Sequence, residues 1–251
     1  MRPSKRELCK VCGQEAKYYL SIPNDHGEPQ VLHLFLCRHC GLLFVGNPVT
    51  DAQLAHAYGT LDWQQYYKEI GFATAGKIAR ALDDLRALVP VSANHRSVLD
   101  VGCGYGHFLD ALSRAYPSVR AAGSELQGEP ALACRARGFT VFTCDLEEVG
   151  EKFNIVALLD VAEHVPSPNR TFAACHSLLE KEGYIYIHTP RRCVWDNLFL
   201  FLARIPGSRR FSKAWLRTRV SIFHLQLWTD KALKLALEKT GFGLVYLKSE
   251  L

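Results

Sequence analysis

The sequence predicts an α/β protein in which a parallel, doubly wound sheet carries helices on both faces and follows a small metal-stabilised module. From residue 97 onward, short apolar runs alternate with amphipathic segments, which is the pattern of repeated β-α units. The first apolar run, "SVLDVG", leads into a loop with three glycines, and two CxxCG pairs stand near the start of the chain. A chain of 251 residues is long enough for one such core with a small appendage.

Residues 1–46 are predicted to form a zinc ribbon. Two CxxC turns can bring four sulfurs to one metal, and a glycine after each pair permits the positive φ of such turns. The expected ligands are Cys9, Cys12, Cys37 and Cys40. Four thiolates suit Zn²⁺ and leave no open coordination position, so a structural metal is expected, and a further role of the ribbon in a substrate mouth or interface stays open. Disulfides are the alternative, but the other, scattered cysteines favour a reducing cytoplasm.

Residues 47–95 are predicted to be a helical linker or lid. Apolar residues recur there at helical spacing (Ile78, Leu82, Leu85, Leu88), and the pattern stops at Pro90. A joint between domains is expected at residues 92–96. The rest of the chain, residues 96–251, is assigned to one Rossmann-like domain.

Strands and helices are expected to alternate through that domain. The predicted strands lie in "SVLDVG", "VRAAGSEL", "TVFTCDL", "FNIVALLDVAEHV" and "YIYIHTP", with a final one in "GLVYLKSEL". The predicted helices lie in "GHFLDALSRAYP", "PALACRARG", "NRTFAACHSLLEKEG" and "DKALKLALEKTGF". Apolar strands in this arrangement are typical of a parallel sheet buried on both faces.

The glycine loop after the first strand favours a nucleoside ligand without phosphates. It lacks the lysine of a phosphate-binding P-loop, and its glycines alternate instead of following the dinucleotide spacing. Asp100, just before the glycines, would repel pyrophosphate and suits a cation. Glu125 ends the second strand, where a carboxylate can accept from both ribose hydroxyls, and Asp145 ends the third, beside Leu146, where it can meet the adenine amino group.

Six segments resemble, in order, the motifs of class I S-adenosylmethionine-dependent methyltransferases. They are "VLDVGCGYGHFLDAL", "GSEL", "CDLEEV", "LLDVAEHVPSP", "LLEKEGYIYIHTP" and "HLQLWTDKALKLALEKTGF". The two CxxCG pairs and a following "YY" resemble the zinc-binding leader of a bacterial subgroup that often modifies sugars or other small biosynthetic intermediates. In this family the sheet usually ends with an antiparallel strand inserted beside the fifth strand. The sequence stops directly after "GLVYLKSEL", so that last strand is expected to be missing. A sheet of six strands, a partner that covers the gap and a shortened chain are the alternatives.

The resemblance implies a set of site residues at the strand ends. The cofactor-binding set is Asp100, Gly102, Cys103, Gly104, Glu125, Leu126, Asp145, Leu146 and Asp160. The catalytic candidates are His164, Asp160 and His188. His164 is the best general-base candidate among them because an imidazole titrates near neutrality, but the interpretation that Glu163 and His164 only hold the loop and cofactor ranks slightly ahead. His224 is a further candidate, expected to be a loop anchor.

A basic, aromatic segment interrupts the last part of the chain. Residues 191–219 contain eight basic residues and one acid, interleaved with aromatic residues, within a cover segment expected at 191–224. Two interpretations of this segment rank level: it binds a small anionic metabolite (a sugar, nucleotide-linked or lipid-like intermediate), or it is a cover whose aromatic residues only pack on the sheet. Peripheral contact with an anionic membrane ranks next. RNA contact ranks last, because no wider basic face accompanies the segment. The expected protein is a cytoplasmic methyltransferase with S-adenosylmethionine and structural Zn²⁺; an RNA base methyltransferase and a non-catalytic, cofactor-binding partner subunit are the alternatives.

Overall fold

The computed structural model describes residues 4–47, 49–59, 63–88, 97–126, 128–205 and 207–248. The chain divides into two compact units. The first consists of Met1–Leu61, Glu163–Phe172 and Pro190–Leu251, and the second of Asp62–Ala162 and Ala173–Thr189. The joint expected at residues 92–96 lies outside the described residues.

The second unit is built on a parallel sheet. Its strands are β5 (Ser97–Val101), β6 (Arg120–Ser124), β7 (Thr140–Phe142), β8 (Phe153–Leu159) and β9 (Leu179–His188). They lie in the order β7-β6-β5-β8-β9, and every neighbouring pair is parallel. This confirms the doubly wound α/β fold, because the strand order reverses on either side of β5.

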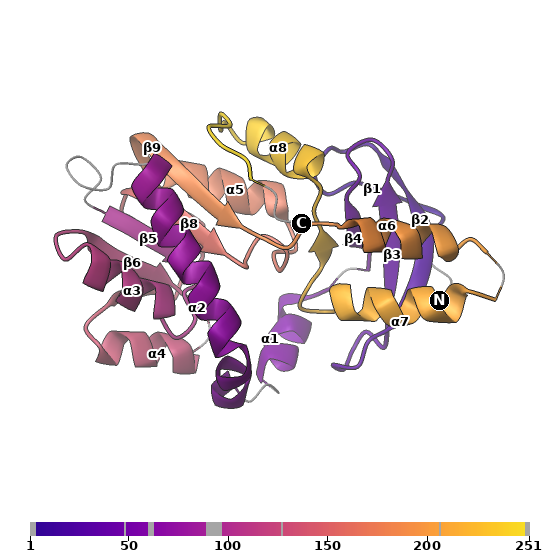
Figure 1. Ribbon diagram of the computed structural model, residues 1–251, viewed down its shortest axis with the longest axis horizontal. Coiled ribbons are helices and arrows are strands. Elements are labelled where there is room, and N and C mark those ends of the chain that lie inside the picture. The colour runs from indigo at the N-terminus through magenta and orange to yellow at the C-terminus, as the bar shows by residue number, and fades with distance from the viewer. Residues whose placement is uncertain are drawn as a thin grey trace. The chain divides into compact units, whose positions relative to one another are not determined.

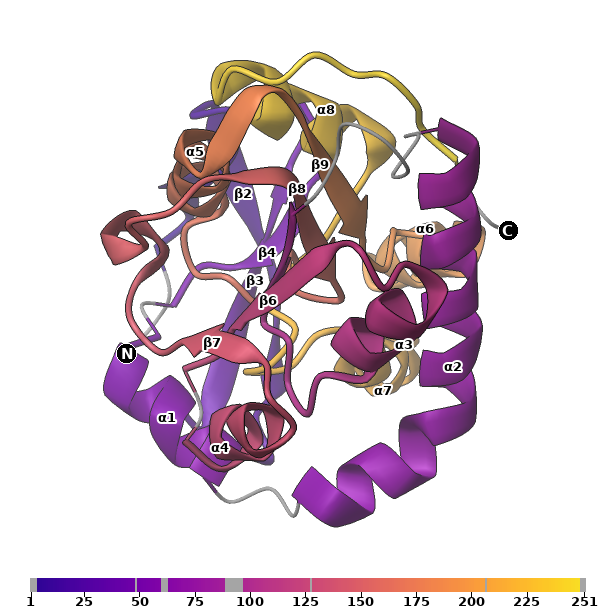
Figure 2. The ribbon, with the colours of Figure 1, turned by 90° about the vertical axis from the view of Figure 1, so that its left-hand side faces the viewer.

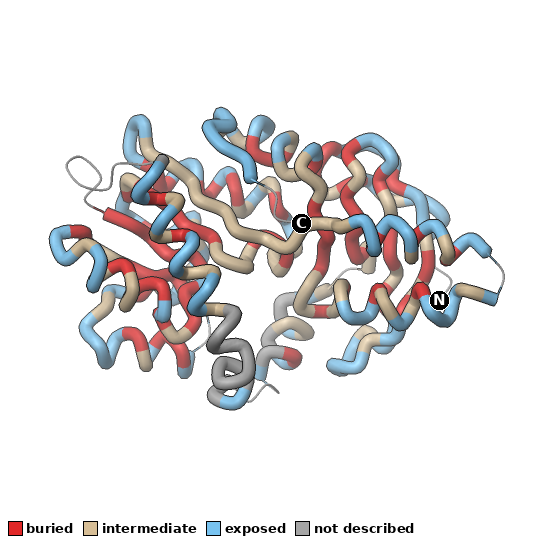
Figure 3. The backbone as a smooth tube through the Cα atoms, in the orientation of Figure 1, coloured by how far each residue is buried: buried red, intermediate tan, exposed pale blue. Residues whose placement is uncertain are grey.

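Helices cover the sheet of the second unit on both faces. On one face lie α2 (Trp63–Leu88), α3 (His107–Ala115) and α4 (Gly128–Ala136). On the other lies the part of α5 (Pro168–Ser177) that belongs to this unit, residues 173–177 (Figure 2). Buried Leu85 of α2 and Phe108 of α3 pack against Val98 and Ile155 of the sheet. The predicted apolar stripe of α2 is thus confirmed at its described side chains. The tube in Figure 3 shows β5 buried along its whole length.

Two of the secondary-structure predictions for residues 97–251 are wrong. The helix expected over 169–183 ends at Ser177, and residues from Leu179 onward belong to β9. Gly183 allows this strand to lie close to its neighbour, because a Cβ there would be 2.9 Å from the carbonyl oxygen of Asn154. The strand expected in "GLVYLKSEL" does not form over residues 243–248, whose side chains include Val245 at 72% exposure. In the described part of the chain this sheet therefore has five strands instead of the six that the sequence allowed, and the last antiparallel strand is not among them.

The first unit contains an antiparallel sheet to which both ends of the chain contribute. Its strands are β1 (Arg6–Leu8), β2 (Glu15–Pro23), β3 (Val31–Cys37), β4 (Leu43–Val45) and β10 (Gln226–Leu227), in that order. The short strand β10 pairs with β4, so the ribbon sheet is extended by a segment from the C-terminal part of the chain. The unit also contains α1 (Asp51–Gly59) and α8 (Asp230–Lys239).

The cover segment packs on the ribbon sheet. It forms α6 (Val194–Leu202) and α7 (Arg209–Arg219), drawn against β2 and β3 in Figure 1. Leu200 and Leu216 of these helices share one buried cluster with Leu34 and Leu43 of the ribbon. This differs from the expected assignment of 191–224 to the Rossmann-like domain. The physical reason is that the apolar face of the ribbon sheet must be buried, and these two helices bury it.

A buried carboxylate fixes α6 to α7. Asp196 is 0% exposed and accepts hydrogen bonds from the Trp215 indole (2.8 Å), the Arg219 guanidinium (3.2 Å) and the backbone N–H of Cys193 (2.8 Å). Burial raises the pKa of Asp196, but these donors favour the ionised form and lower it overall. The folded state therefore holds this carboxyl as an anion.

We expect Asp196→Asn to lower the free energy of unfolding at pH 7 by about 2–3 kcal/mol, because charged hydrogen bonds at a buried site are lost. The folded pKa of Asp196 lies below its unfolded value of about 3.9, so the stabilisation is present above that pH and disappears as the pH falls through the folded pKa. Urea unfolding followed by tryptophan fluorescence at pH 7 and in acid measures both effects. The matched control Asp230→Asn removes an exposed ion pair with Arg191 and should change stability by less than about 1 kcal/mol. Equal loss in both variants would contradict the assignment.

Candidate active site

The predicted cofactor residues of the second unit lie at one edge of its sheet. Because all five strands are parallel, their carboxyl ends meet at the same edge, and ligands of open α/β sheets bind there. Gly102 follows β5, Glu125 follows β6 and Asp160 follows β8. His188 is the last residue of β9. The structure thus brings together residues that are far apart in the sequence.

The glycine loop requires glycine for its backbone conformation. Gly102, Gly104 and Gly106 have φ values of 68°, 50° and 71°, in the left-handed region that glycine favours. At Gly102 a Cβ would also lie 2.8 Å from Cγ2 of Val161. The loop is held by the N–H of Gly102, which donates to the carbonyl oxygen of Ser124 (2.7 Å). The chain therefore turns sharply at the end of β5, and of the three glycines Gly102 is exposed whereas Gly104 and Gly106 are buried.

Two carboxylates stand beside this loop. The N–H of Gly104 donates to Oε2 of Glu125 at 3.0 Å, which joins the ends of β5 and β6. Asp100 is 3% exposed, and burial, followed by the nearby Glu125, raises its pKa well above the usual range. A cationic ligand would stabilise the ionised form of such a pair, whereas phosphate would oppose it. The chemistry of the donor set fits a positively charged nucleoside cofactor.

The remaining predicted cofactor residues include both exposed and buried side chains. Leu126 is 67% exposed, and Asp145 is exposed at the start of a short 3₁₀ turn, Leu146–Glu148. Cys103 turns its side chain into the core, where its Sγ would be 2.4 Å from a Cβ at Gly123. Burial raises the pKa of the Cys103 thiol. Its side chain therefore contributes to packing, and only its backbone belongs to the loop.

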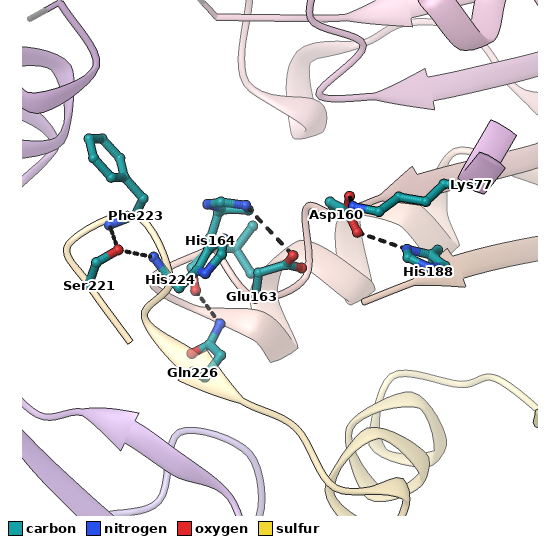
Figure 4. A network of polar contacts seen from close by, with 10 residues as sticks. Lys77, Asp160, Glu163, His164, His188, Ser221, Phe223, His224 and Gln226 are labelled. Atoms are coloured by element: carbon teal, nitrogen blue, oxygen red, sulfur yellow. Dashed lines mark hydrogen bonds and ion pairs between the residues drawn. The ribbon is translucent and has the colours of Figure 1, made fainter. Parts of the chain in front are cut away.

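Asp160 and His188 form a hydrogen-bonded pair at the strand ends. Oδ1 of Asp160 lies 2.8 Å from Nδ1 of His188, and Lys77 of α2 forms an ion pair with the other carboxylate oxygen (Figure 4). Burial raises the pKa of Asp160, but His188 and Lys77 lower it overall, so the carboxyl is ionised. Asp160 also has a φ of 55°, an uncommon value for a residue with a side chain. A strained backbone that aims a carboxylate at a histidine is typical of functional sites.

Lys77 is the residue of this group that the sequence did not reveal. It lies 83 residues before Asp160 on a different element, and the pattern of α2 marks only its apolar stripe. Only the packing of α2 on the sheet brings the two side chains together.

The third catalytic candidate, His164, belongs to the first unit. The centroids of the His164 and His224 rings lie 4.8 Å apart, edge to face, and Nε2 of His164 lies 3.7 Å from Oε1 of Glu163 (Figure 4). The contact between His164 and His224 is not predictable from the sequence, because no sequence pattern links positions so far apart.

The four cysteines of the ribbon converge in the first unit. Sγ of Cys9 lies 3.6 Å from that of Cys40, and Sγ of Cys12 lies 3.4 Å from that of Cys37. All four ligand atoms lie within 4.8 Å of one another. These separations are far longer than the ~2.05 Å of a disulfide bond and suit four ligands around one zinc ion. Contact between the two thiols lowers the pKa of Cys9 and raises that of Cys40, and a bound metal ion would hold both sulfurs as thiolates.

Residues from the C-terminal part of the chain hold the two knuckles. Lys239 donates to the carbonyl oxygens of Val11 (3.1 Å) and Cys12 (2.8 Å). Thr229 donates through Oγ1 to the carbonyl oxygen of Cys40 at 2.6 Å. The sequence gives the ligands, but these supporting donors are visible only in the structure.

Comparison with known proteins places these features in context. A family model described as "Methyltransferase domain" matches residues 73–247. A ubiquinone biosynthesis O-methyltransferase of Pseudomonas paraeruginosa is 31% identical over 107 residues, which cover 39% of this chain and 45% of that protein. The corresponding enzyme of Bordetella avium is 31% identical over 120 residues, covering 44% of this chain and 49% of that protein. The matched part is thus about half the length of these curated relatives.

Solved structures share the fold. The mycolic acid cyclopropane synthase CmaA1, in complex with SAH and CTAB, has a TM-score of 0.56 and 20% identity, covering 70% of this chain and 63% of that one. The plantazolicin methyltransferase BpumL, with SAH and a desmethyl analogue, has a TM-score of 0.51 and 14% identity, covering 72% and 71%. At these identities the likeness shows the α/β architecture alone.

We expect the purified chain to contain one zinc ion at the ribbon and Cys37→Ser to lose it, because three thiolates cannot close the tetrahedral site. Elemental analysis of extensively dialysed protein measures the metal. Cys175→Ser, which changes a buried cysteine of α5 outside the cluster, is the matched control and should retain the metal. Full zinc content in Cys37→Ser would contradict the site.

Proposed function

The chain belongs to the family defined by the methyltransferase domain, and we propose that it transfers a methyl group from S-adenosylmethionine to a hydroxyl group of a small, lipid-like metabolite. The observation that carries the proposal is the Asp160–His188 pair at the strand ends, next in the sheet to the glycine loop of β5. The curated relatives named above are O-methyltransferases, which supports oxygen as the acceptor atom.

The cofactor is proposed to lie along the carboxyl edge of the sheet. Its methionine portion would contact Asp100 and the backbone of Gly102 and Gly104, where the buried carboxylate favours a cation. The ribose hydroxyls would donate to Glu125. Asp145 would accept from the adenine amino group. The apolar side chains proposed to line the adenine are those of Leu126 and Leu146.

His188 is proposed to act as the general base. Its Nδ1 is engaged by the ionised Asp160, which holds the tautomer with a proton on that atom and leaves Nε2 to accept the proton of the acceptor hydroxyl. As that proton leaves, the oxygen attacks the methyl carbon, the carbon–sulfur bond breaks, and the sulfonium becomes a neutral thioether. Lys77 keeps Asp160 ionised and so acts as a positioning residue.

The surface of α6 and α7 supports a lipid-like acceptor. Val194, Trp195 and Phe201 of α6 are 72%, 57% and 59% exposed, and Phe211 of α7 is 55% exposed. The basic residues of the segment that lie exposed are Arg204, Arg209, Arg210 and Arg217. Exposed aromatic residues among arginines are typical of a surface that binds an anionic bilayer at its interface.

Peripheral contact is the form of membrane association proposed for this surface. Across the described residues, none of the helices has the length and apolar character needed to span a bilayer. None of the nine cysteines forms a disulfide, which supports a reducing compartment such as the cytoplasm. A cytoplasmic enzyme with this surface could take its acceptor from the inner face of a membrane.

The membrane contact predicts binding to vesicles that contain anionic phospholipid, with weaker binding at high salt. Replacing two exposed aromatic residues, Trp195→Ser with Phe201→Ser, should weaken co-sedimentation roughly tenfold, because their apolar area no longer enters the interface. Leu8→Ser, at a 72% exposed position on β1, is the matched control and should bind as the unchanged protein does. Equal binding by the double variant would exclude α6 as the contact.

The function itself is tested by incubating the protein and methyl-labelled S-adenosylmethionine with fractionated cell extract. Label is expected in a small organic-soluble product, and His188→Gln should lower the rate by about 10²- to 10⁴-fold, the range of general base catalysis. Calorimetry should show that this variant binds the cofactor about as tightly as the unchanged protein. Label in RNA would instead indicate an RNA methyltransferase, cofactor binding without any labelled product a non-catalytic subunit, and full activity of His188→Gln a different base.

A further inference from the structure

A second group of metal-ligand side chains lies in the first unit, apart from the four cysteines. Glu163, His164 and His224 each offer one ligand atom, and these atoms all lie within 4.8 Å of one another. Nε2 of His164 lies 3.7 Å from Oε1 of Glu163. Figure 4 shows the three side chains gathered where the loop after β8 meets the segment before β10.

Backbone and side-chain contacts on either side hold these residues in place. The N–H of Leu225 donates to the carbonyl oxygen of Glu163 at 2.8 Å, and Nε2 of Gln226 donates to that of Val165 at 2.8 Å. The side chain of Gln226 is fully buried. The two segments are therefore joined at positions directly beside the ligands, which gives the group a fixed scaffold.

A tight turn presents His224. The hydroxyl of Ser221 accepts from the N–H groups of Phe223 and His224, both at 3.1 Å, and the N–H of Ser221 donates to the carbonyl oxygen of His224 at 3.2 Å. This closed turn fixes the backbone from which the imidazole projects. A ligand on a fixed backbone loses little freedom when it binds a metal.

The donor set indicates which metal would bind. Two imidazoles and one carboxylate suit divalent transition metals such as Zn²⁺, whereas Mg²⁺ and Ca²⁺ prefer oxygen ligands alone. Glu163 is 1% exposed, and a carboxylate so deeply buried is stabilised by a nearby positive charge. A divalent ion between Glu163 and the two histidines supplies that charge.

We propose that Glu163, His164 and His224 bind a second metal ion, a divalent transition metal of the Zn²⁺ class. The site is separate from the ribbon cluster and differs from it in kind. Three protein ligands leave at least one coordination position open, so an oxygen of a hydroxyl group or anion can complete the coordination. The ribbon site, with four thiolates, has no such position.

The alternative is a protonated His164 that forms an ion pair with Glu163. Both arrangements provide a positive charge next to the carboxylate, but only the metal site requires His224. Binding of a second zinc ion, and its dependence on His224, therefore distinguishes the two arrangements.

The experiment uses the full chain with its ribbon zinc in place. The protein is incubated with excess ZnCl₂, freed of unbound metal and analysed for zinc, and the binding of Zn²⁺ is followed by calorimetry. The unchanged protein is expected to hold two zinc ions per chain, and Cys37→Ser only one. His224→Gln and His164→Gln should each bind the second ion more than about tenfold more weakly, because they remove one of three ligands. His176→Gln, which changes an exposed histidine of α5, should bind it unchanged.

One zinc per chain in the unchanged protein would overturn the proposal and favour the ion pair. A second zinc that persists in His224→Gln would also overturn it, because the metal would then lie elsewhere. Circular dichroism of each histidine variant separates loss of a ligand from loss of folding, and the single ribbon zinc should remain in both. The measurements need neither cofactor nor acceptor, so their result is independent of the proposed methyl transfer.

Discussion

Parallel pairing of five strands is the constraint on which the rest of the second unit depends. It brings the ends of β5, β6, β7, β8 and β9 to one edge, although those ends are spread over nearly ninety residues of the chain. The glycine loop, the buried Asp100 and the Asp160–His188 pair owe their proximity to this register. A shift of one residue in any strand would turn its side chains to the opposite face and remove its terminal residue from the edge.

The first unit depends on a different constraint, the stabilisation of a small sheet. A ribbon sheet of this size exposes an apolar face that its own strands cannot cover, and small modules of this kind need additional stabilisation. Here the stabilisation comes from the four-cysteine cluster and from α6 and α7, which close over that face. The buried Asp196 then joins the two helices through charged hydrogen bonds. A metal site, an apolar cluster and a buried carboxylate thus act together on one small sheet.

The same two helices have two opposed faces. Their inner side chains, such as Leu200 and Leu216, are buried against the ribbon, and their outer ones, such as Trp195 and Phe201, face solvent. Sequence composition alone shows an arginine-rich, aromatic segment and cannot say which aromatic residues are buried. The tertiary structure therefore decides which aromatic residues of α6 and α7 form an exposed surface and which are buried.

The sequence by itself determined the features that depend on local pattern. Spacing identified the zinc ligands and the three glycines, and apolar runs identified the five parallel strands and the helix α2, because these signals lie within a few neighbouring residues. Prediction from the sequence failed where long-range packing determines the secondary structure. Residues 179–183 became strand through pairing with β8, and residues 243–248 found no partner strand in the described part of the chain. Only the tertiary structure placed Lys77 beside Asp160, His224 beside His164 and the cover helices on the ribbon, because each of these contacts joins residues far apart in the chain, and no local pattern records them.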